Sequence, residues 1–251
     1  MISSYELKTI ERCLCCASRT ENGFCAMSMT ALEAFDRIKI SYNFRKDVVL
    51  FLEGEPARGI FVLCKGQVKL SLCAGDGKTC ILNVAKPGEA LGLSAVLSGS
   101  PYEFTAETLE PCEVNFVKGD DFLRFLRENP EACFQITKQL GLNYYNACHE
   151  IRSLGLSHSA GEKLAKLLLE WTVRDVDSHK ADLRVRLSVG QDEIAQMIGC
   201  CRETVTRLFA DLRRRRIAEC RRSVLLIHDK HALKDLADNR IARLRIAPPS
   251  A

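Results

Sequence analysis

The chain has 251 residues, of which 47% are hydrophobic and 27% charged, a composition typical of a folded protein and unlike that of a disordered one. Its length suits two domains of about 100–150 residues each. No stretch approaches the roughly 20 apolar residues of a membrane span, and residues 1–12 lack a signal-peptide core, so we expect a cytoplasmic protein. Residues 152–251 hold 20 Lys and Arg against 13 Asp and Glu, whereas residues 1–151 carry a net charge of −3. The C-terminal part is therefore expected to bind a polyanion.

Residues 1–29 form a short cysteine-rich N-terminal segment, which contains Cys13, Cys15, Cys16 and Cys25. The whole chain has 13 cysteines, an odd number, and no export signal. A disulfide framework is a poor interpretation in a reducing compartment, so metal binding or redox sensing is the better hypothesis.

Residues 30–129 read as a domain of many short strands separated by turns, such as residues 48–52, 59–63 and 67–72. This pattern predicts a compact β-barrel or β-roll. Residues 130–156 then predict one long helix, with Pro130 in its first turn and Asn129 as N-cap. Such a helix is either a spacer between domains or a coiled-coil seam with a second copy of the chain.

Residues 157–251 are mostly helical and contain a helix-turn-helix pattern between residues 188 and 212. Ser188 and Gln191 fit a capping box, and Gly199 supplies the turn. Val205, Leu208 and Leu212 are expected to form the buried face of the second helix.

Four polar residues of that second helix are predicted to face DNA: Arg202, Glu203, Thr206 and Arg207. Arginine pairs bidentately with guanine, and glutamate accepts from cytosine. The arginines at 213–216 suit phosphates, which give affinity without sequence information. The alternative is an amphipathic helix pair with a solvated charged face.

Three motifs together resemble the Crp/Fnr family of bacterial transcription regulators over nearly the whole chain. They are the turn around Gly66, the stretch Gly88-Glu89-Ala90-Leu91-Gly92, and residues 198–207. The resemblance implies an α+β fold with a sensory β-roll, a dimerisation helix and a winged helix-turn-helix at residues 157–251. It also implies a homodimer that binds a near-palindromic DNA site and contacts RNA polymerase. We expect no enzyme, because no paired carboxylates, catalytic triad, phosphate-binding glycine loop or zinc-protease motif is present.

Family members that bind a cyclic nucleotide carry an Arg-Ser or Arg-Thr pair shortly after the Gly-Glu segment. The corresponding stretch here, residues 100–106, has no arginine and places Glu103 where a phosphate would need a cation. A cyclic nucleotide is therefore not expected.

The cysteines resemble those of the iron–sulfur subgroup, which senses oxygen. By this resemblance Cys13, Cys16, Cys25 and Cys112 are the ligands of a [4Fe–4S] cluster, whose loss would shift the dimer equilibrium and release DNA. The gap between Cys16 and Cys25 is longer than usual, and Cys15 competes with Cys16. A zinc site, thiol redox chemistry or another small-molecule effector are the alternatives. Cys64, Cys73 and Cys80 are interpreted as small hydrophobic residues of the roll.

The recognition helix itself resembles that of the cyclic-AMP receptor protein, because iron–sulfur members generally lack an arginine at the position of Arg202. The resemblance predicts a TGTGA-like half-site rather than a TTGAT-like one.

Overall fold

The computed structural model describes residues 5–6, 13–16, 23–75, 77–156, 159–174, 183–221 and 223–238. The contacts divide the chain into two compact units, Met1–Ala147 and Cys148–Ala251, with the division inside the long helix α4 (Pro130–Leu156). In the described ranges no helix is both long enough and apolar enough to cross a membrane.

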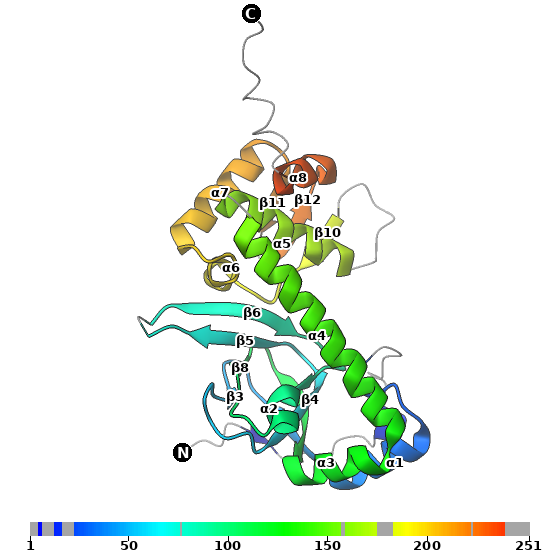
Figure 1. Ribbon diagram of the computed structural model, residues 1–251. Helices are drawn as coiled ribbons and strands as arrows, with labels where there is room; N and C mark the ends of the chain where they lie inside the picture. The colour runs from blue at the N-terminus through cyan, green and yellow to red at the C-terminus, as the bar shows by residue number, and fades with distance from the viewer. Residues whose placement is uncertain are drawn as a thin grey trace, which may run out of the picture. The chain divides into compact units, whose positions relative to one another are not determined.

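Two antiparallel sheets form the body of the first unit (Figure 1). One sheet has the strand order β1 (Tyr5–Glu6), β2 (Ile40–Phe44), β9 (Cys112–Lys118), β4 (Gly59–Lys65) and β7 (Ala90–Leu91). The other has the order β3 (Val49–Phe51), β8 (Thr105–Thr108), β5 (Val68–Cys73) and β6 (Thr79–Ala85). The prediction of a strand-rich roll is confirmed.

The two faces of the first sheet pack against two different cores. Its inner face meets the second sheet, and this inner core includes Phe51, Leu63, Val68 and Val114. Its outer face is covered by α1 (Met29–Ile38), α3 (Gly119–Glu128) and the start of α4. This outer core includes Leu32, Phe35, Ile60, Val62, Val117, Phe122 and Phe125. Since side chains alternate along a strand, neighbouring residues of β4 and β9 enter different cores.

The N-terminal cysteine segment packs on the outer core. The short 3₁₀ helix η1 (Cys13–Cys15) lies against α1, and the buried side chains of Cys13, Phe24 and Met27 belong to the outer core. Ser28 caps α1 by accepting a hydrogen bond from the Ala31 N–H. The small helix α2 (Leu93–Ser98) contributes to both cores, with Leu93 and Val96 in the outer core and Ala95 in the inner core.

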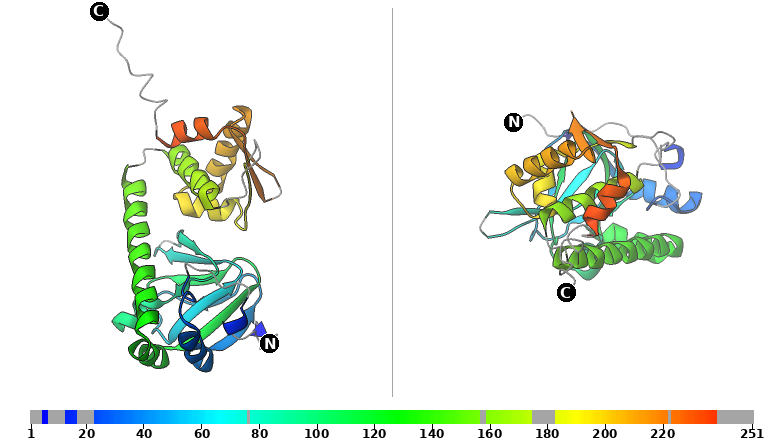
Figure 2. Two further views of the ribbon diagram at one scale, coloured as in Figure 1. Left: turned by 90° about the vertical axis from the view of Figure 1, so that its right-hand side faces the viewer. Right: turned by 90° about the horizontal axis from the view of Figure 1, so that it is seen from above.

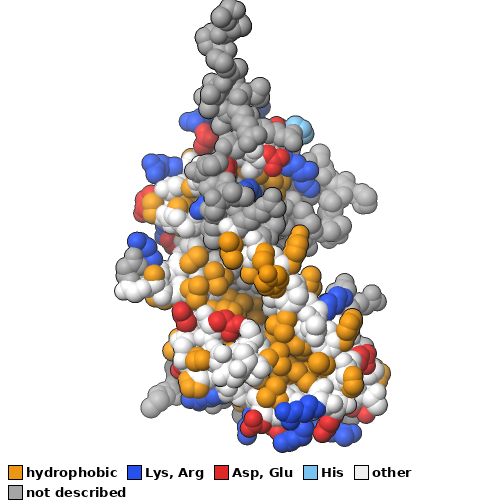
Figure 3. All heavy atoms as spheres, in the orientation of Figure 1, with side chains coloured by type: hydrophobic (Ala, Val, Ile, Leu, Met, Phe, Trp, Pro, Cys, Tyr) orange, Lys and Arg blue, Asp and Glu red, His pale blue; other side chains and the backbone are white. Residues whose placement is uncertain are grey.

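Helix α4 begins at Pro130, as the sequence predicts, although Asn129 does not cap it with its side chain. The Asn129 amide instead donates to the Phe125 carbonyl, at the end of α3, at 2.9 Å. Along α4 the structure exposes large apolar side chains, namely Phe134, Leu142, Tyr144, Tyr145 and Ile151. Figure 3 shows apolar side chains gathered along the path of α4 in the first unit.

The second unit is a winged helix-turn-helix. It comprises α5 (Ala160–Arg174), β10 (Leu183–Arg186), α6 (Gln191–Ile198), α7 (Arg202–Arg214), β11 (Ala218–Arg221), β12 (Val224–Ile227) and α8 (Lys230–Ala237). The antiparallel sheet β10-β12-β11 forms the wing, and α5 packs against α8 (Figure 2).

Candidate DNA interface and cysteine site

The turn between α6 and α7 depends on Gly199, which ends α6 with a φ of 67°. Glycine adopts this left-handed conformation without the steric cost that other residues meet. The capping prediction was wrong by two residues. The N-cap of α6 is Gly190 and not Ser188, and the Gly190 N–H donates to the Glu193 carboxylate at 2.8 Å. Ser188 and Gln191 do not form the box, because α6 begins only at Gln191.

Helix α7 buries Val205, Phe209 and Leu212 against the rest of the unit. The sequence prediction had Leu208 in place of Phe209. Leu208 is half-buried and lies where a side chain at Gly161 of α5 would meet it. The opposite face of α7 is exposed, and it carries all four residues predicted to face DNA, Arg202, Glu203, Thr206 and Arg207.

Two polar bridges tie this exposed face to α6. The Arg202 guanidinium pairs with the Asp192 carboxylate at 3.0 Å, and both side chains are largely exposed. The Thr206 hydroxyl donates to the Gln191 side-chain oxygen at 2.7 Å. The pKa of Glu203 is lowered, first because its carboxylate accepts from its own backbone N–H, so the side chain is ionised and acts only as an acceptor.

The basic run at the end of α7 is partly neutralised by two carboxylates. Asp211 pairs with Arg214 and with Arg215. The buried Glu219 of β11 pairs with Arg213 at 3.5 Å and with Arg221 at 3.0 Å. These contacts hold the guanidinium groups near the recognition helix and the wing, where phosphates would be met.

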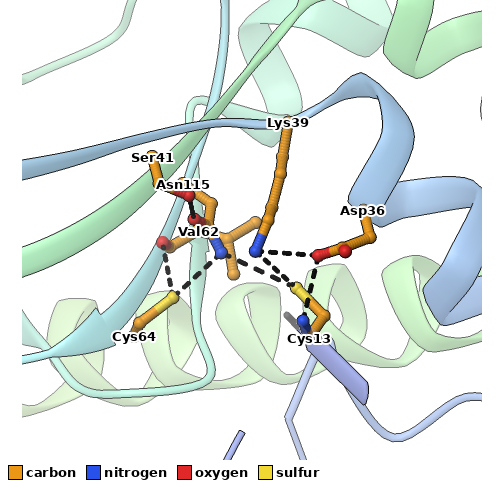
Figure 4. Close-up of polar contacts among 7 residues, drawn as sticks. All are labelled: Cys13, Asp36, Lys39, Ser41, Val62, Cys64 and Asn115. Carbon is orange, nitrogen blue, oxygen red and sulfur yellow. Dashed lines mark hydrogen bonds and ion pairs between the residues drawn. The ribbon is translucent and has the colours of Figure 1, made fainter. Parts of the chain in front are cut away.

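A second polar site surrounds Cys13 (Figure 4). The Lys39 ammonium donates to the Cys13 sulfur at 3.2 Å and pairs with the Asp36 carboxylate at 2.9 Å. Asp36 also accepts from the Cys13 backbone N–H at 2.9 Å. Burial raises the pKa of the Cys13 thiol, and the Lys39 charge opposes this rise.

Asn115 of β9 links Cys13 to Cys64 of β4. Its amide nitrogen donates to the Cys64 sulfur at 3.1 Å and lies 3.9 Å from the Cys13 sulfur. Its amide oxygen accepts from the Ser41 hydroxyl at 2.6 Å. The side chain of Asn115 is therefore fully engaged, with its N–H groups directed at sulfur atoms (Figure 4).

The other two cysteines expected in the site, Cys16 and Cys25, lie near the same place. The pKa of Cys64 is raised to about 12, first by burial and then by the nearby thiols of Cys25, Cys13 and Cys16. Cys15 is exposed and is not among the groups that raise the pKa of Cys64. The thiols of Cys13, Cys16 and Cys25 therefore all lie near Cys64.

Cys112 lies elsewhere. It belongs to the inner core, and its sulfur donates to the carbonyls of Glu110 and Gln67 at 3.1 and 3.4 Å. The pKa of Cys112 is raised to about 11 by burial, with no contribution from another thiol. Cys112 and Asn115 are three residues apart on one strand, so they point to opposite faces of the sheet. The sequence placed Cys112 with the N-terminal cysteines; the structure does not.

Sequence reasoning did not consider Asn115 and Lys39, and it interpreted Cys64 only as a small hydrophobic residue of the roll. Cys64 shares its alternation on β4 with Ile60 and Val62, but only the structure shows that these two residues are buried in the outer core. For the part of the chain that the structure describes, no three His, Cys, Asp or Glu side chains stand close enough together to hold one metal ion.

Residues 100–106 are the stretch in which the sequence lacks an arginine to hold a phosphate. In the structure this stretch places the Tyr102 side chain in the interior of the roll. Tyr102 is buried and stacks on Phe51 with ring centroids 4.0 Å apart, and its hydroxyl donates to the Gly59 carbonyl at 2.7 Å. The Glu103 carboxylate accepts from the Ser94 hydroxyl.

Comparison with known proteins identifies both units. Residues 42–129 match the cyclic nucleotide-binding domain family, and residues 162–236 match the Crp-like helix-turn-helix domain family. Over 190 residues the chain is 30% identical to the transcriptional activatory protein AadR of Rhodopseudomonas palustris, covering 74% of this chain and 76% of AadR. It is 25% identical over 210 residues to the CRP-like cAMP-activated global transcriptional regulator of Mycobacterium tuberculosis, covering 84% and 93% of the two chains.

Solved structures show the same fold. FixK2 from Bradyrhizobium japonicum superposes with a TM-score of 0.70 at 22% identity, over 79% of this chain and 97% of FixK2. A CooA mutant from Carboxydothermus hydrogenoformans superposes with a TM-score of 0.70 at 20% identity, over 80% and 88% of the two chains. The relatives from Rhodopseudomonas palustris and Mycobacterium tuberculosis are a transcriptional activator and a transcriptional regulator by name. With its β-roll, long helix and exposed recognition helix, the chain belongs to the Crp/Fnr family of DNA-binding transcription regulators.

Proposed function

We propose that this regulator responds to oxygen or redox state through a [4Fe–4S] cluster bound by its N-terminal cysteines. One observation carries the proposal: the buried Cys13 lies beside Cys64 of the roll, N–H donors of Lys39 and Asn115 point at these two sulfur atoms, and the thiols of Cys16 and Cys25 lie near Cys64. Thiolates are the protein ligands of such clusters, and hydrogen bonds to sulfur tune their potential.

The donor set fits the cluster. Lys39 and Asn115 place positive hydrogen atoms against sulfur, and these contacts oppose the effect of burial, which favours thiols over thiolates. A single zinc ion has Zn–S bonds of about 2.3 Å, so its thiolates lie within about 4 Å of one another. No such tight group of three exists in the described residues, which counts against a preformed site for a single zinc ion. Bound there, the cluster supplies the oxygen-sensitive redox chemistry.

The cysteine segment is connected to α4 within the first unit. Cys13 and Phe24 share the outer core with Ala132 and Ile136 of α4. The Phe24 N–H also donates to the Gly88 carbonyl at 2.8 Å. Two residues further on, the backbone of Ala90 exchanges two hydrogen bonds with the Gln139 side chain of α4. Order in the cysteine segment therefore supports the packing of α4 on the roll.

This connection suggests how the signal reaches DNA. The apolar residues exposed on α4 are a suitable seam for a second copy of the chain, and we expect a homodimer there. A dimer presents two recognition helices about one helical turn apart, which suits a near-palindromic site. A change of a few kcal/mol in the dimer equilibrium is enough to switch DNA binding. RNA polymerase is the expected protein partner on DNA.

A cyclic nucleotide is not part of the proposal, although the roll belongs to the cyclic nucleotide-binding domain family. Two features support this choice. Glu103 brings a negative charge into the stretch where a phosphate needs a cation, and the Tyr102 ring occupies the space beside Phe51.

The test is purification without oxygen, followed by counts of iron and acid-labile sulfide and an absorbance spectrum. We expect about four iron and four sulfide per chain, and loss of both together with specific DNA binding on exposure to air. Protein with one zinc per chain and no sulfide would show that the cysteines form a structural zinc site without a sensory role.

A further inference from the structure

We propose that Cys64, on strand β4, is the ligand that the roll contributes to the cysteine site, in place of Cys112. The inference rests on the proposed function, because it names the fourth thiolate of the same cluster. It departs from what the resemblance predicts, and four structural observations support it.

The first observation is that Cys64 lies on the face of the sheet that is turned toward the outer core. Ile60 and Val62 of β4 are buried in the outer core, where the N-terminal segment packs, and Cys64 continues their alternation. Phe61 and Leu63 face the inner core instead. A bulge in the pairing of β4 with β9 falls at Leu63–Lys65, so Cys64 is the extra residue there. Bulges redirect side chains and are frequent beside functional sites.

The second observation is the shared donor. Asn115 is 2% exposed, and its amide nitrogen reaches the sulfur atoms of both Cys64 and Cys13. Ser41 occupies the amide oxygen, so the nitrogen is the end that faces sulfur. A buried amide must satisfy its hydrogen-bonding groups, and here it does so with two thiols from separate parts of the domain sequence.

The third observation is the route of the chain from Cys25. Phe24 donates its N–H to the Gly88 carbonyl, and Gly88 donates its N–H to the Leu63 carbonyl, both at 2.8 Å. Cys25 follows Phe24, and Cys64 follows Leu63. Two backbone hydrogen bonds therefore fix the segment that carries Cys25 beside the strand that carries Cys64.

The fourth observation concerns Cys112. Its sulfur is turned toward the Glu110 and Gln67 carbonyls on the inner side of the sheet. A Cβ added to Gly66 would lie 2.6 Å from this sulfur, so the backbone of the turn closes over it. For Cys112 to reach Cys13, β9 would have to reverse its side-chain alternation and bury Asn115 in the inner core. A reversal of that kind would destroy the packing on both faces of the sheet.

The experiment compares Cys64→Ser with Cys112→Ser in the full chain, purified without oxygen, with Cys73→Ser as a matched control for an exposed cysteine of the roll. Iron, acid-labile sulfide and the visible absorbance are measured, and circular dichroism confirms that each variant is folded. We expect Cys64→Ser to lose most of its iron and sulfide, with Cys112→Ser and Cys73→Ser within the range of the wild type. If Cys112→Ser fails to fold, Cys112→Ala takes its place, since it removes the thiol without adding a polar group.

The outcomes separate the two proposals. Wild-type protein without sulfide would refute the proposed function and this inference with it. Wild-type protein with a full cluster, together with loss in Cys112→Ser and retention in Cys64→Ser, would refute only the choice of Cys64. Loss in both folded variants would also refute that choice, because Cys112 would then be needed.

Discussion

Arg202→Val tests whether the first residue of the recognition helix reads a base. A bidentate arginine–guanine contact provides roughly 1–3 kcal/mol of discrimination. In the free protein Arg202 is held by Asp192 at 3.0 Å, with the two side chains 62% and 59% exposed. An exposed pair of this kind contributes about 0–1 kcal/mol, which must be given up when guanine is bound. The net preference at this base pair is therefore about 0–3 kcal/mol, with a mid-range value of about 1.5 kcal/mol, or roughly tenfold.

The assay is competition binding between duplexes that carry TGTGA and its inverted copy and duplexes changed only at the second position of each half-site. Wild-type protein should prefer the first set, and Arg202→Val should lose the preference there while other positions change little. Asp192→Asn should increase the preference by up to about fivefold, because it releases Arg202 from its partner. Arg214→Val is the control: it should weaken binding to every sequence alike and reduce the salt dependence. Selection of TTGAT-like sites by the wild type would show that Arg202 contacts phosphate.

Five further outcomes are expected. Cyclic AMP at millimolar concentration should change neither the melting temperature nor the DNA affinity, and a clear rise in melting temperature would mean that the roll binds it. Gly199→Ala should lower the free energy of unfolding by about 1 kcal/mol, because only its φ of 67° is strained and no atom lies within 4 Å of the added Cβ. Gly66→Ala should cost about 3 kcal/mol, since its φ of 89° is combined with a clash against Cys112, and equal melting temperatures for the two variants would contradict this account. Asn115→Leu should keep the iron but lower the reduction potential of the site, because N–H donors to sulfur favour the reduced form; an unchanged potential would remove Asn115 from this role. Tyr145→Glu on the exposed side of α4 should shift the protein toward monomer in analytical ultracentrifugation, and an unaltered equilibrium would place the dimer seam elsewhere.

Local sequence patterns were sufficient for much of this protein. Gly199 between two amphipathic segments predicted the helix-turn-helix, because a left-handed turn there has few alternatives to glycine. Pro130 marked the start of α4 because proline lacks the N–H that the first helical turn does not need. The exposure of Arg202, Glu203, Thr206 and Arg207 followed from their positions opposite Val205 on a helix of 3.6 residues per turn.

Tertiary structure decided the rest, and the cysteines show why. Cys64 and Cys112 both lie on strands of the same sheet, and nothing in their immediate sequence tells which side of that sheet the N-terminal segment will cover. A strand offers alternate side chains to two faces, so a one-residue difference in alternation moves a thiol from one core to the other. Only the packing of α1, α3 and the start of α4 made one face the outer core, and thereby brought Cys64 and Asn115 to Cys13 and left Cys112 between the sheets.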